Sequence, residues 1–354
     1  MLNQRALADQ LGLSQTTVSR ALRNHPSIAP ATRERVWQEA QKAGYRPNPQ
    51  VSALMEQIRQ GRTPEIHSTI AILSGTDPKH FPRNSTTQRL YQGHCEHAQE
   101  YGYSTEVFPV PSNQKQSVEL DRILYSRGIA GIIFAYSGGE EGLPIPDLHW
   151  DRYAIATVSD VFAHLPIDRA STDHQRNTNR AYLELLRRGY KRIGICLPEH
   201  SIEARDGYDN SWLSAYLACN FRRPKSLQIP VFTGTIHDTK CSRFQSWYER
   251  HRPDALITLL GEEIQWLNEL KLAPPQDIGL VSLNRPPDSH LSGIDENNLQ
   301  VGRAVCELVV SRLTHNQLGL PTSPRRVLVD GIWCEGETLS NPSAPIPPRG
   351  GPRV

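Results

Sequence analysis

The chain contains 354 residues, of which 38% are hydrophobic and 21% are charged, and its formal net charge is +2. This composition is typical of a globular protein, and the length allows two or three domains. No run of about 18 apolar residues is present, so no membrane-spanning helix is expected. Residues 1–20 also lack the apolar core of a secretory signal, so we expect a cytoplasmic protein.

The net charge is distributed unevenly along the chain. Residues 1–62 contain nine Lys and Arg against four Asp and Glu, a local net charge of +5, and the remaining residues sum to −3. A basic N-terminal segment before a slightly acidic body favours a polyanionic partner for that segment. Charge alone leaves a chance excess of bases as the alternative.

Three short helices are predicted at the N-terminus, over residues 3–11, 14–23 and 31–43. Ala8, Gly12 and Val18 have the spacing of a helix-turn-helix, which needs a small contact residue, a turn and an apolar lock. The second helix then presents polar side chains to a DNA major groove, where Gln bonds adenine and Arg bonds guanine. We predict a DNA-binding domain over residues 1–48; the alternative is a three-helix bundle with a solvated polar face.

A hinge is predicted over residues 49–68. Asn48 followed by Pro49 is a suitable start for a short helix, because proline fits the first helical position. The stretch GRTPEIHS, which ends at residue 68, is typical of a linker. The hinge helix would therefore connect the N-terminal domain to the body through a loose segment.

The body alternates short apolar strands with helical patterns. Strands are predicted at 69–73, 129–135, 153–158, 192–197, 255–259 and 278–283. Helices are predicted near 87–101, 117–126, 174–188, 209–219, 241–250, 261–271 and 296–314. This alternation indicates an α/β body of parallel sheets covered on both faces, and its length over 69–340 predicts two doubly wound subdomains. Residues 341–354 are rich in Pro and Gly and are predicted to be a disordered tail.

The segments VSRALRN and ATRERVWQEAQKAGYRPN, with the alternating body, resemble the lactose-repressor (LacI/GalR) family of bacterial transcription regulators. The resemblance implies an all-α head on a body like that of periplasmic binding proteins. The chain would cross between the two subdomains near residues 160, 288 and 321. The resemblance also implies a repressor that binds a near-palindromic double-stranded DNA operator as a homodimer. A sugar-like small molecule in the body would modulate its DNA affinity.

The resemblance implies roles, by position, for residues of the head and hinge. Base edges would be read by Gln15, Thr16 and Arg20. DNA phosphates would be contacted by Thr17, Ser19, Arg23, Asn24, Thr32 and Arg33. The minor groove would be entered by Asn48, Ser52, Leu54 and Met55, with Leu54 as the wedge that kinks the operator. Ser52 and Ala53 replace the Arg that usually precedes this leucine, which departs from the family pattern.

The positions that bind effectors in the family differ in this chain. Leu260-Gly261 stands where the family has Asn-Asp, and Asn284-Arg285 stands where it has two aspartates. Losing these carboxylates removes acceptors for sugar hydroxyls. The ligand is then a different sugar, an acidic compound attracted by Arg205 and Arg285, or absent. Candidate effector residues by position are Thr76, Asp77, Tyr136, Ser159, Asp160, Arg205, Trp212, Asn284 and Arg285.

Other function classes have little support in the sequence. There is no G-x-S-x-G, phosphate-loop or H-E-x-x-H motif, and the six cysteines lack metal-ligand spacing. We therefore expect no enzymatic activity, no catalytic residue, no metal and no cofactor. The main alternative is a sugar-binding receptor without a DNA-binding function, and the basic N-terminal segment argues against it.

Overall fold

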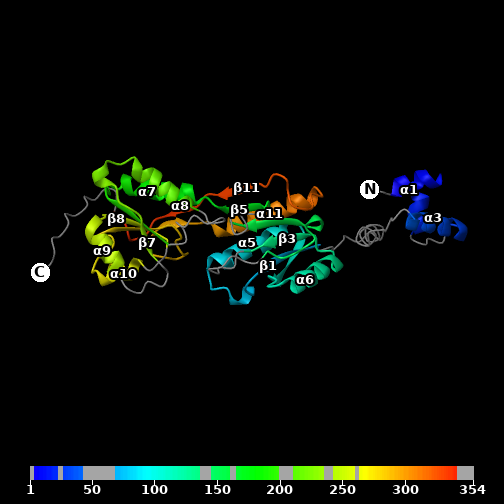
Figure 1. The fold of residues 1–354 in the computed structure, drawn as a ribbon, viewed down its shortest axis with the longest axis horizontal. Coiled ribbons are helices and arrows are strands. Elements are labelled where there is room, and N and C mark those ends of the chain that lie inside the picture. The colour runs from blue at the N-terminus through cyan, green and yellow to red at the C-terminus, as the bar shows by residue number, and fades with distance from the viewer. Residues whose placement is uncertain are drawn as a thin grey trace. The chain divides into compact units, whose positions relative to one another are not determined.

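The computed structural model describes residues 4–22, 27–42, 68–135, 145–159, 165–198, 210–234, 242–259 and 263–340. The chain divides into two compact units, Met1–Ile66 and His67–Val354, called here the head and the body (Figure 1). The predicted tail lies outside the described residues, as does the predicted hinge except for Ser68, which begins the first strand of the body. No helix in the described ranges is long and apolar enough to cross a membrane.

The head consists of three helices, α1 (Gln4–Leu11), α2 (Gln15–Leu22) and α3 (Pro30–Lys42). Their shared core is formed by Leu7, Ala8, Leu11, Val18, Ala21, Leu22, Val36 and Ala40. Gly12 has a φ of +64° in the turn between α1 and α2, a conformation that disfavours side chains with a Cβ. The three helices agree with those expected from the capping residues and the apolar spacing.

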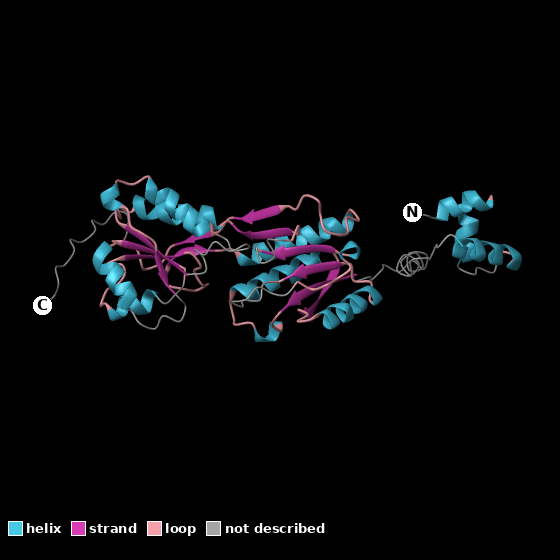
Figure 2. Ribbon diagram, viewed as in Figure 1, coloured by secondary structure: helices cyan, strands magenta, loops and turns pink. Residues whose placement is uncertain are grey.

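The first lobe of the body is built on a six-stranded parallel sheet in the order β11-β5-β4-β3-β1-β2 (Figure 2). Its strands are β1 (Ser68–Ser74), β2 (Tyr103–Pro109), β3 (Gly131–Phe134), β4 (Ala154–Val158), β5 (Asp168–Thr172) and β11 (Arg326–Val329). Its helices are α5 (Thr86–Glu100), α6 (Gln114–Ser126) and α11 (Asn298–Thr314), with short 3₁₀ turns η1 (Pro78–His80) and η2 (Trp150–Arg152).

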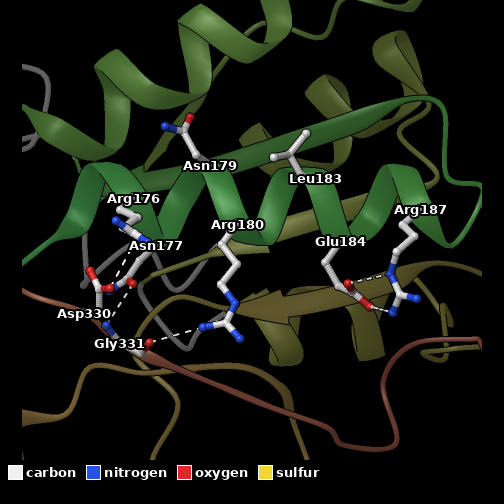
Figure 3. A pocket seen from close by; sticks show the side chains of 9 residues that line it. All are labelled: Arg176, Asn177, Asn179, Arg180, Leu183, Glu184, Arg187, Asp330 and Gly331. Carbon is white, nitrogen blue, oxygen red and sulfur yellow. Dashed lines mark hydrogen bonds and ion pairs between the residues drawn. The ribbon is translucent and has the colours of Figure 1, made fainter.

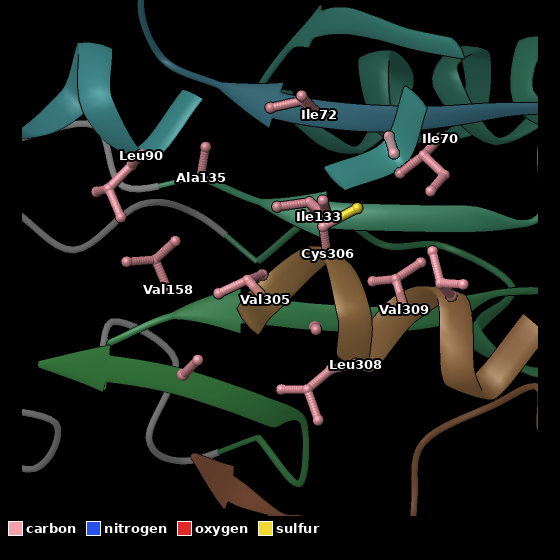
Figure 4. Close-up of a cluster of buried hydrophobic side chains, with 14 of the residues drawn as sticks. Ile70, Ile72, Leu90, Ile133, Ala135, Val158, Val305, Cys306, Leu308 and Val309 are labelled. Atoms are coloured by element: carbon pink, nitrogen blue, oxygen red, sulfur yellow. The ribbon is translucent and has the colours of Figure 1, made fainter. Parts of the chain in front are cut away.

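Alternating side chains of the first sheet pack on its two faces, as the period of a strand requires. Ile70 and Ile72 of β1 contact the residues of α5 and α11, including Val305 and Val309 (Figure 4). The opposite face packs against α6. A Cβ on Gly302 would lie 2.2 Å from the carbonyl oxygen of Leu90, so glycine is what lets α5 and α11 approach this closely.

The second lobe is built on a sheet in the order β12-β10-β9-β8-β6-β7, in which only the β10–β12 pair is antiparallel. Its strands are β6 (Ile193–Pro198), β7 (Phe232–Gly234), β8 (Ala255–Thr258), β9 (Gly279–Ser282), β10 (Ser292–Asp295) and β12 (Ile332–Cys334). Helices α7 (His174–Arg187) and α8 (Ser211–Phe221) cover one face, and α9 (Ser242–His251) and α10 (Glu263–Glu269) cover the other. One 3₁₀ turn, η4 (Lys225–Leu227), follows α8.

The chain crosses between the lobes after β5, between β10 and α11, and between β11 and β12. The crossovers expected near residues 160, 288 and 321 are therefore wrong, and each precedes the true crossing by one strand. The cause is that β5 (DRAST), β10 (SGID) and β11 (RVLV) are short, and the first two carry little apolar signal. Each lobe consequently contains strands from distant parts of the chain.

Candidate nucleic-acid interface and ligand cleft

The outer face of α2 carries the polar residues proposed to read DNA. Val18 and Ala21 are fully buried in the head, whereas Gln15, Thr16 and Arg20 are exposed on the same helix. The amphipathic spacing therefore places these three side chains on a free surface above a fixed apolar base. Such a surface has the shape and the donors needed to enter a DNA major groove.

The start of α2 is fixed by a side-chain cap. The Ser14 Oγ accepts a hydrogen bond from the Thr17 amide at 3.1 Å, and it lies 2.8 Å from the Thr17 hydroxyl oxygen. This cap satisfies an amide that the first helical turn leaves unpaired. Thr17 thus combines a predicted phosphate-contacting position with a role in holding the recognition helix.

Helix α3 is tied to α1 through Arg35, a contact that the sequence does not signal. The Arg35 Nη2 donates to the carbonyl of Leu11 at 3.1 Å, at the C-terminal end of α1, where unpaired carbonyls favour a cation. Thr32 and Arg33, predicted to contact phosphates, are half-buried in the first turn of α3.

Several predicted DNA contacts lie outside the described residues. These are Arg23, Asn24, Asn48, Ser52, Leu54 and Met55, together with the side chain of Ser19.

The body contains a cleft of about 400 Å³ between its two lobes. Val158, Thr172 and Pro198 stand at the ends of β4, β5 and β6, so the carboxyl ends of strands from both sheets meet there, the usual ligand position in such folds. The complete lining is Thr86, Leu90, Val158, Ser159, Ser171, Thr172, His174, Pro198, Trp212, Leu259, Asn284, Glu296, Asn298 and Val301.

An aromatic pair and a buried acid lie on one side of this cleft. The rings of His174 and Trp212 have centroids 4.0 Å apart. The His174 Nδ1 lies 3.5 Å from Glu296 Oε1, and Asn298 donates to Glu296 Oε2 at 3.3 Å. Burial raises the pKa of the Glu296 carboxyl above its usual value, and the His174 imidazole opposes that rise. The cleft therefore contains a carboxyl suited to bonding hydroxyl groups.

The Ser171 hydroxyl and the Trp212 indole N–H are buried atoms of residues that line the cleft, and neither has a hydrogen-bond partner in the described part of the chain. Leaving such groups unpaired costs about 1–3 kcal/mol each. A polar ligand is one means of removing that cost.

A bidentate ion pair ties the lobes together beside the cleft. The Arg89 guanidinium on α5 donates to both carboxylate oxygens of Asp295 on β10, at 2.9 and 3.1 Å. Both side chains are less than one-fifth exposed, so solvent screens the pair only partly. The contact joins the first helix of one lobe to the strand that leads out of the other.

Three of the predicted effector residues, Ser159, Trp212 and Asn284, line the cleft. Asp77 instead pairs with Lys79 and caps η1, and the neighbouring Thr76 is also absent from the lining. Arg285 does not line the cleft, and its guanidinium donates to the carbonyls of Leu291, Pro286 and Ser289 in its own loop. Tyr136, Asp160 and Arg205 lie outside the described residues.

Sequence reasoning missed Ser171, His174 and Glu296. Ser171 and His174 flank the end of β5, and Glu296 follows β10, neither of which was predicted as a strand. Recognising those strands would have placed all three residues at carboxyl ends, where ligands bind.

A separate groove of about 440 Å³ follows α7 and has a structural explanation (Figure 3). Arg176 pairs with Asp330 at 3.4 Å, Arg180 donates to the Gly331 carbonyl at 3.3 Å, and Arg187 pairs with Glu184 at 2.7 Å. The first two contacts fasten α7 to the link between β11 and β12, so this basic surface serves the lobe junction.

Comparison with known proteins assigns both units. Residues 6–48 match the family described as bacterial regulatory proteins, lacI family, and residues 183–338 match the periplasmic binding protein-like domain. The chain is 43% identical over 272 residues to the HTH-type transcriptional regulator GalS of Salmonella typhimurium, a match covering 75% of this chain and 70% of GalS. The chain belongs to the lacI family of bacterial regulatory proteins.

A solved structure of the same lacI fold is the lac repressor dimer bound to operator and the anti-inducer ONPF. It superimposes with a TM-score of 0.53 at 18% identity, covering 96% of this chain and 99% of that one. The match to AglR of Rhizobium meliloti, at 30% identity, spans 38% of this chain and 35% of AglR. The family resemblance and the fold class expected from the sequence are confirmed, and this lacI-family chain is a DNA-binding regulator of transcription.

Proposed function

We propose that this regulator represses transcription by binding a near-palindromic DNA operator as a homodimer, with one head on each half-site. The observation that carries the proposal is the exposed face of α2, where Gln15, Thr16 and Arg20 stand above the buried Val18. The net charge of +5 over residues 1–62 supplies the attraction to phosphates. Two-fold symmetry of the dimer would be matched by symmetry of the operator.

Within this proposal the head residues divide by role. Gln15, Thr16 and Arg20 read base edges in the major groove. Thr17, Ser19, Arg23, Asn24, Thr32 and Arg33 contact phosphates and fix the register. Asn48, Ser52, Leu54 and Met55 belong to a hinge that enters the minor groove, where Leu54 kinks the duplex.

The cleft of the body is proposed to bind the effector, a small polyhydroxylated molecule of the sugar class. Glu296, Asn284 and the unpartnered Ser171 hydroxyl supply acceptors and donors for hydroxyl groups. Trp212 supplies apolar contact for a ring face. Binding across both lobes would change how they close and, through the hinge, how the heads engage DNA.

The proposed role also implies where the protein acts and that it needs no catalytic activity. A protein that binds chromosomal operators acts in the cytoplasm of a bacterial cell. The binding equilibria that it exploits need no enzymatic step, and we propose that it has none.

Selection of bound genomic fragments by the full chain tests the proposal. The fragments retained at moderate salt are expected to share a near-palindromic motif, and retention should fall steeply as salt rises. Retention of DNA without a shared motif, or retention that ignores salt, would overturn the assignment of an operator.

A further inference from the structure

A second cavity, called here the outer cavity, opens beside the cleft and has a different chemistry. Its volume is about 460 Å³, and Thr86, Asn284 and Asn298 line both spaces. These shared residues make the two cavities neighbouring parts of one ligand-accessible region. The outer cavity is the more polar part, because Arg83, Arg89 and Arg285 line it.

Two of the three arginines in the outer cavity have no carboxylate partner among the described residues. Arg89 is neutralised by Asp295, whereas neither Arg83 nor Arg285 forms an ion pair within the part of the chain that the structure describes. Arg285 is only partly exposed, and its guanidinium is bonded to neutral backbone carbonyls, which fix its position without cancelling its charge. Asp288 also lines the cavity, so one exposed carboxylate stands against the two guanidinium groups and leaves the lining net positive.

Helix α5 adds a third source of positive potential. It begins at Thr86 in the wall of the outer cavity and continues for 15 residues, with Ser85 as its cap. The amides at such an end carry partial positive charge that favours an anion. The two unpaired guanidinium groups and the helix start therefore favour the same kind of ligand group.

The inner cleft disfavours an anion and favours hydroxyl groups. Its charged lining residue is the buried Glu296, whose carboxyl would repel a negative ligand group. The Ser171 side chain is 3% exposed and its hydroxyl lacks a partner in the described structure, so a neutral polar group is suited to this part. A ligand that occupies both spaces must be neutral and hydroxylated at one end and anionic at the other.

We propose that the effector is a sugar phosphate, with its ring in the cleft and its phosphoryl group in the outer cavity between Arg83 and Arg285. The inference rests on the proposed effector-binding function and narrows its ligand class. A phosphoryl group is favoured over a carboxylate because its several acceptor oxygens can bond two guanidinium groups and a helix start at once. Arg285, although not in the lining of the cleft itself, thereby acts on the same ligand.

Calorimetric titration of the full chain with matched pairs of probes tests this assignment. The probes are glucose 6-phosphate, fructose 6-phosphate and fructose 1-phosphate, each against its parent sugar, and inorganic phosphate alone. At least one sugar phosphate is expected to bind more than about tenfold tighter than its parent sugar, because charge-assisted bonds to arginine are among the strongest polar contacts. Equal affinity within every pair, or no binding by any sugar phosphate, would overturn the proposal.

Arg83→Ala isolates the phosphate contact, because this side chain is exposed and forms no ion pair or side-chain hydrogen bond with another described residue. The variant should lose about tenfold in affinity for the sugar phosphate and keep its affinity for the parent sugar. Arg122→Ala is the matched control, since Arg122 is exposed on α6, which packs on the opposite face of the same sheet. Equal losses in the two variants would overturn the site.

Operator binding, measured on the same preparations without ligand, tests the proposed operator-binding function separately from the sugar-phosphate proposal. Intact operator binding with failed phosphate discrimination rejects only the sugar-phosphate assignment. Failure of the unmodified chain to bind any operator would instead reject the proposed function.

Discussion

The head and the cleft position their functional side chains in opposite ways. In the head, Gln15 and Arg20 are held outward by Val18 on the same short helix, so spacing within a few residues decides what is exposed. In the cleft, Ser159, Trp212 and Glu296 come from three distant segments, and the packing of two sheets brings them together. A local site is therefore specified by helical periodicity, whereas a cleft is specified by topology.

The largest expected effect concerns stability. We expect the stability of the body, but not that of the head, to depend on a buried group of charged side chains. Asp168 is fully buried, with Arg325 at 2.8 Å and Arg312 at 3.5 Å. Asp168→Ala leaves two cations without their anion and should cost about 3–5 kcal/mol of unfolding free energy. Denaturant unfolding of the full chain should show the loss in the body's transition, with the helical transition of the head unchanged.

Asp151→Ala is the matched control, because Asp151 is exposed and has no ion pair among the described residues. A similar loss in this variant would remove the special role assigned to the buried network.

The next effect tests the local character of the head. Arg20→Ala should weaken operator binding by about 1–3 kcal/mol and relax the preference at one base position. The ligand affinity of the body should stay the same, because Arg20 belongs to the other compact unit. Fluorescence anisotropy with single-base operator variants measures both the operator affinity and the base preference. An unchanged base preference would contradict the base-reading role.

Trp212→Ala tests the cleft without touching the head. Removing the indole takes away the ring that packs at a tilt against His174 and an apolar wall of the cavity. Ligand affinity should fall by about 1–2 kcal/mol, as expected for the loss of an aromatic contact. Operator affinity without ligand should be preserved in a titration of the same preparation; a parallel drop in both would mean that the variant disturbs the whole body.

The smallest effect is a pH dependence that only the body should show. Burial, with the nearby Asp295, raises the pKa of Glu296, while His174, Asn298 and Arg89 oppose the rise. The folded state then holds this proton more tightly than the unfolded state, so stability is lost as pH rises from the usual carboxyl range through the raised pKa. Glu296→Gln should flatten that decline in thermal unfolding curves, and an unchanged slope would exclude Glu296 as its source.

The same contrast explains which parts were predictable from the sequence. The helix-turn-helix of the head was predictable from Ala8, Gly12 and Val18, because the spacing of these residues determines which of them meet where the two helices pack. The helices of the body were also predictable, since α7 and α11 carry long amphipathic or apolar patterns. Trp212, early in α8, and Asn284, shortly after the end of β9, were expected in the cleft from the positions of effector residues in the family, although Asn284 stands where the family has an aspartate.

The missed features depend on pairing between segments far apart in the chain. β5 reads DRAST, which looks polar until β4 and β11 are known to flank it. Because β5 was not predicted, the first crossover was expected too early in the chain, and Ser171 and His174 were not recognised as cleft residues. Arg285 misled for a different reason: charge suggested a cleft residue, but carbonyls of its own loop hold its guanidinium, an arrangement that sequence spacing does not reveal.

The pairing of β11 with β5 also has a consequence for synthesis of the protein. The sheet of the first lobe takes its edge strand from Arg326–Val329, near the C-terminal end of the chain. The head can form its core once Ala40 has left the ribosome, but the first lobe must wait for almost the whole polypeptide. A nascent chain would therefore acquire its DNA-binding surface well before the part that regulates it is complete.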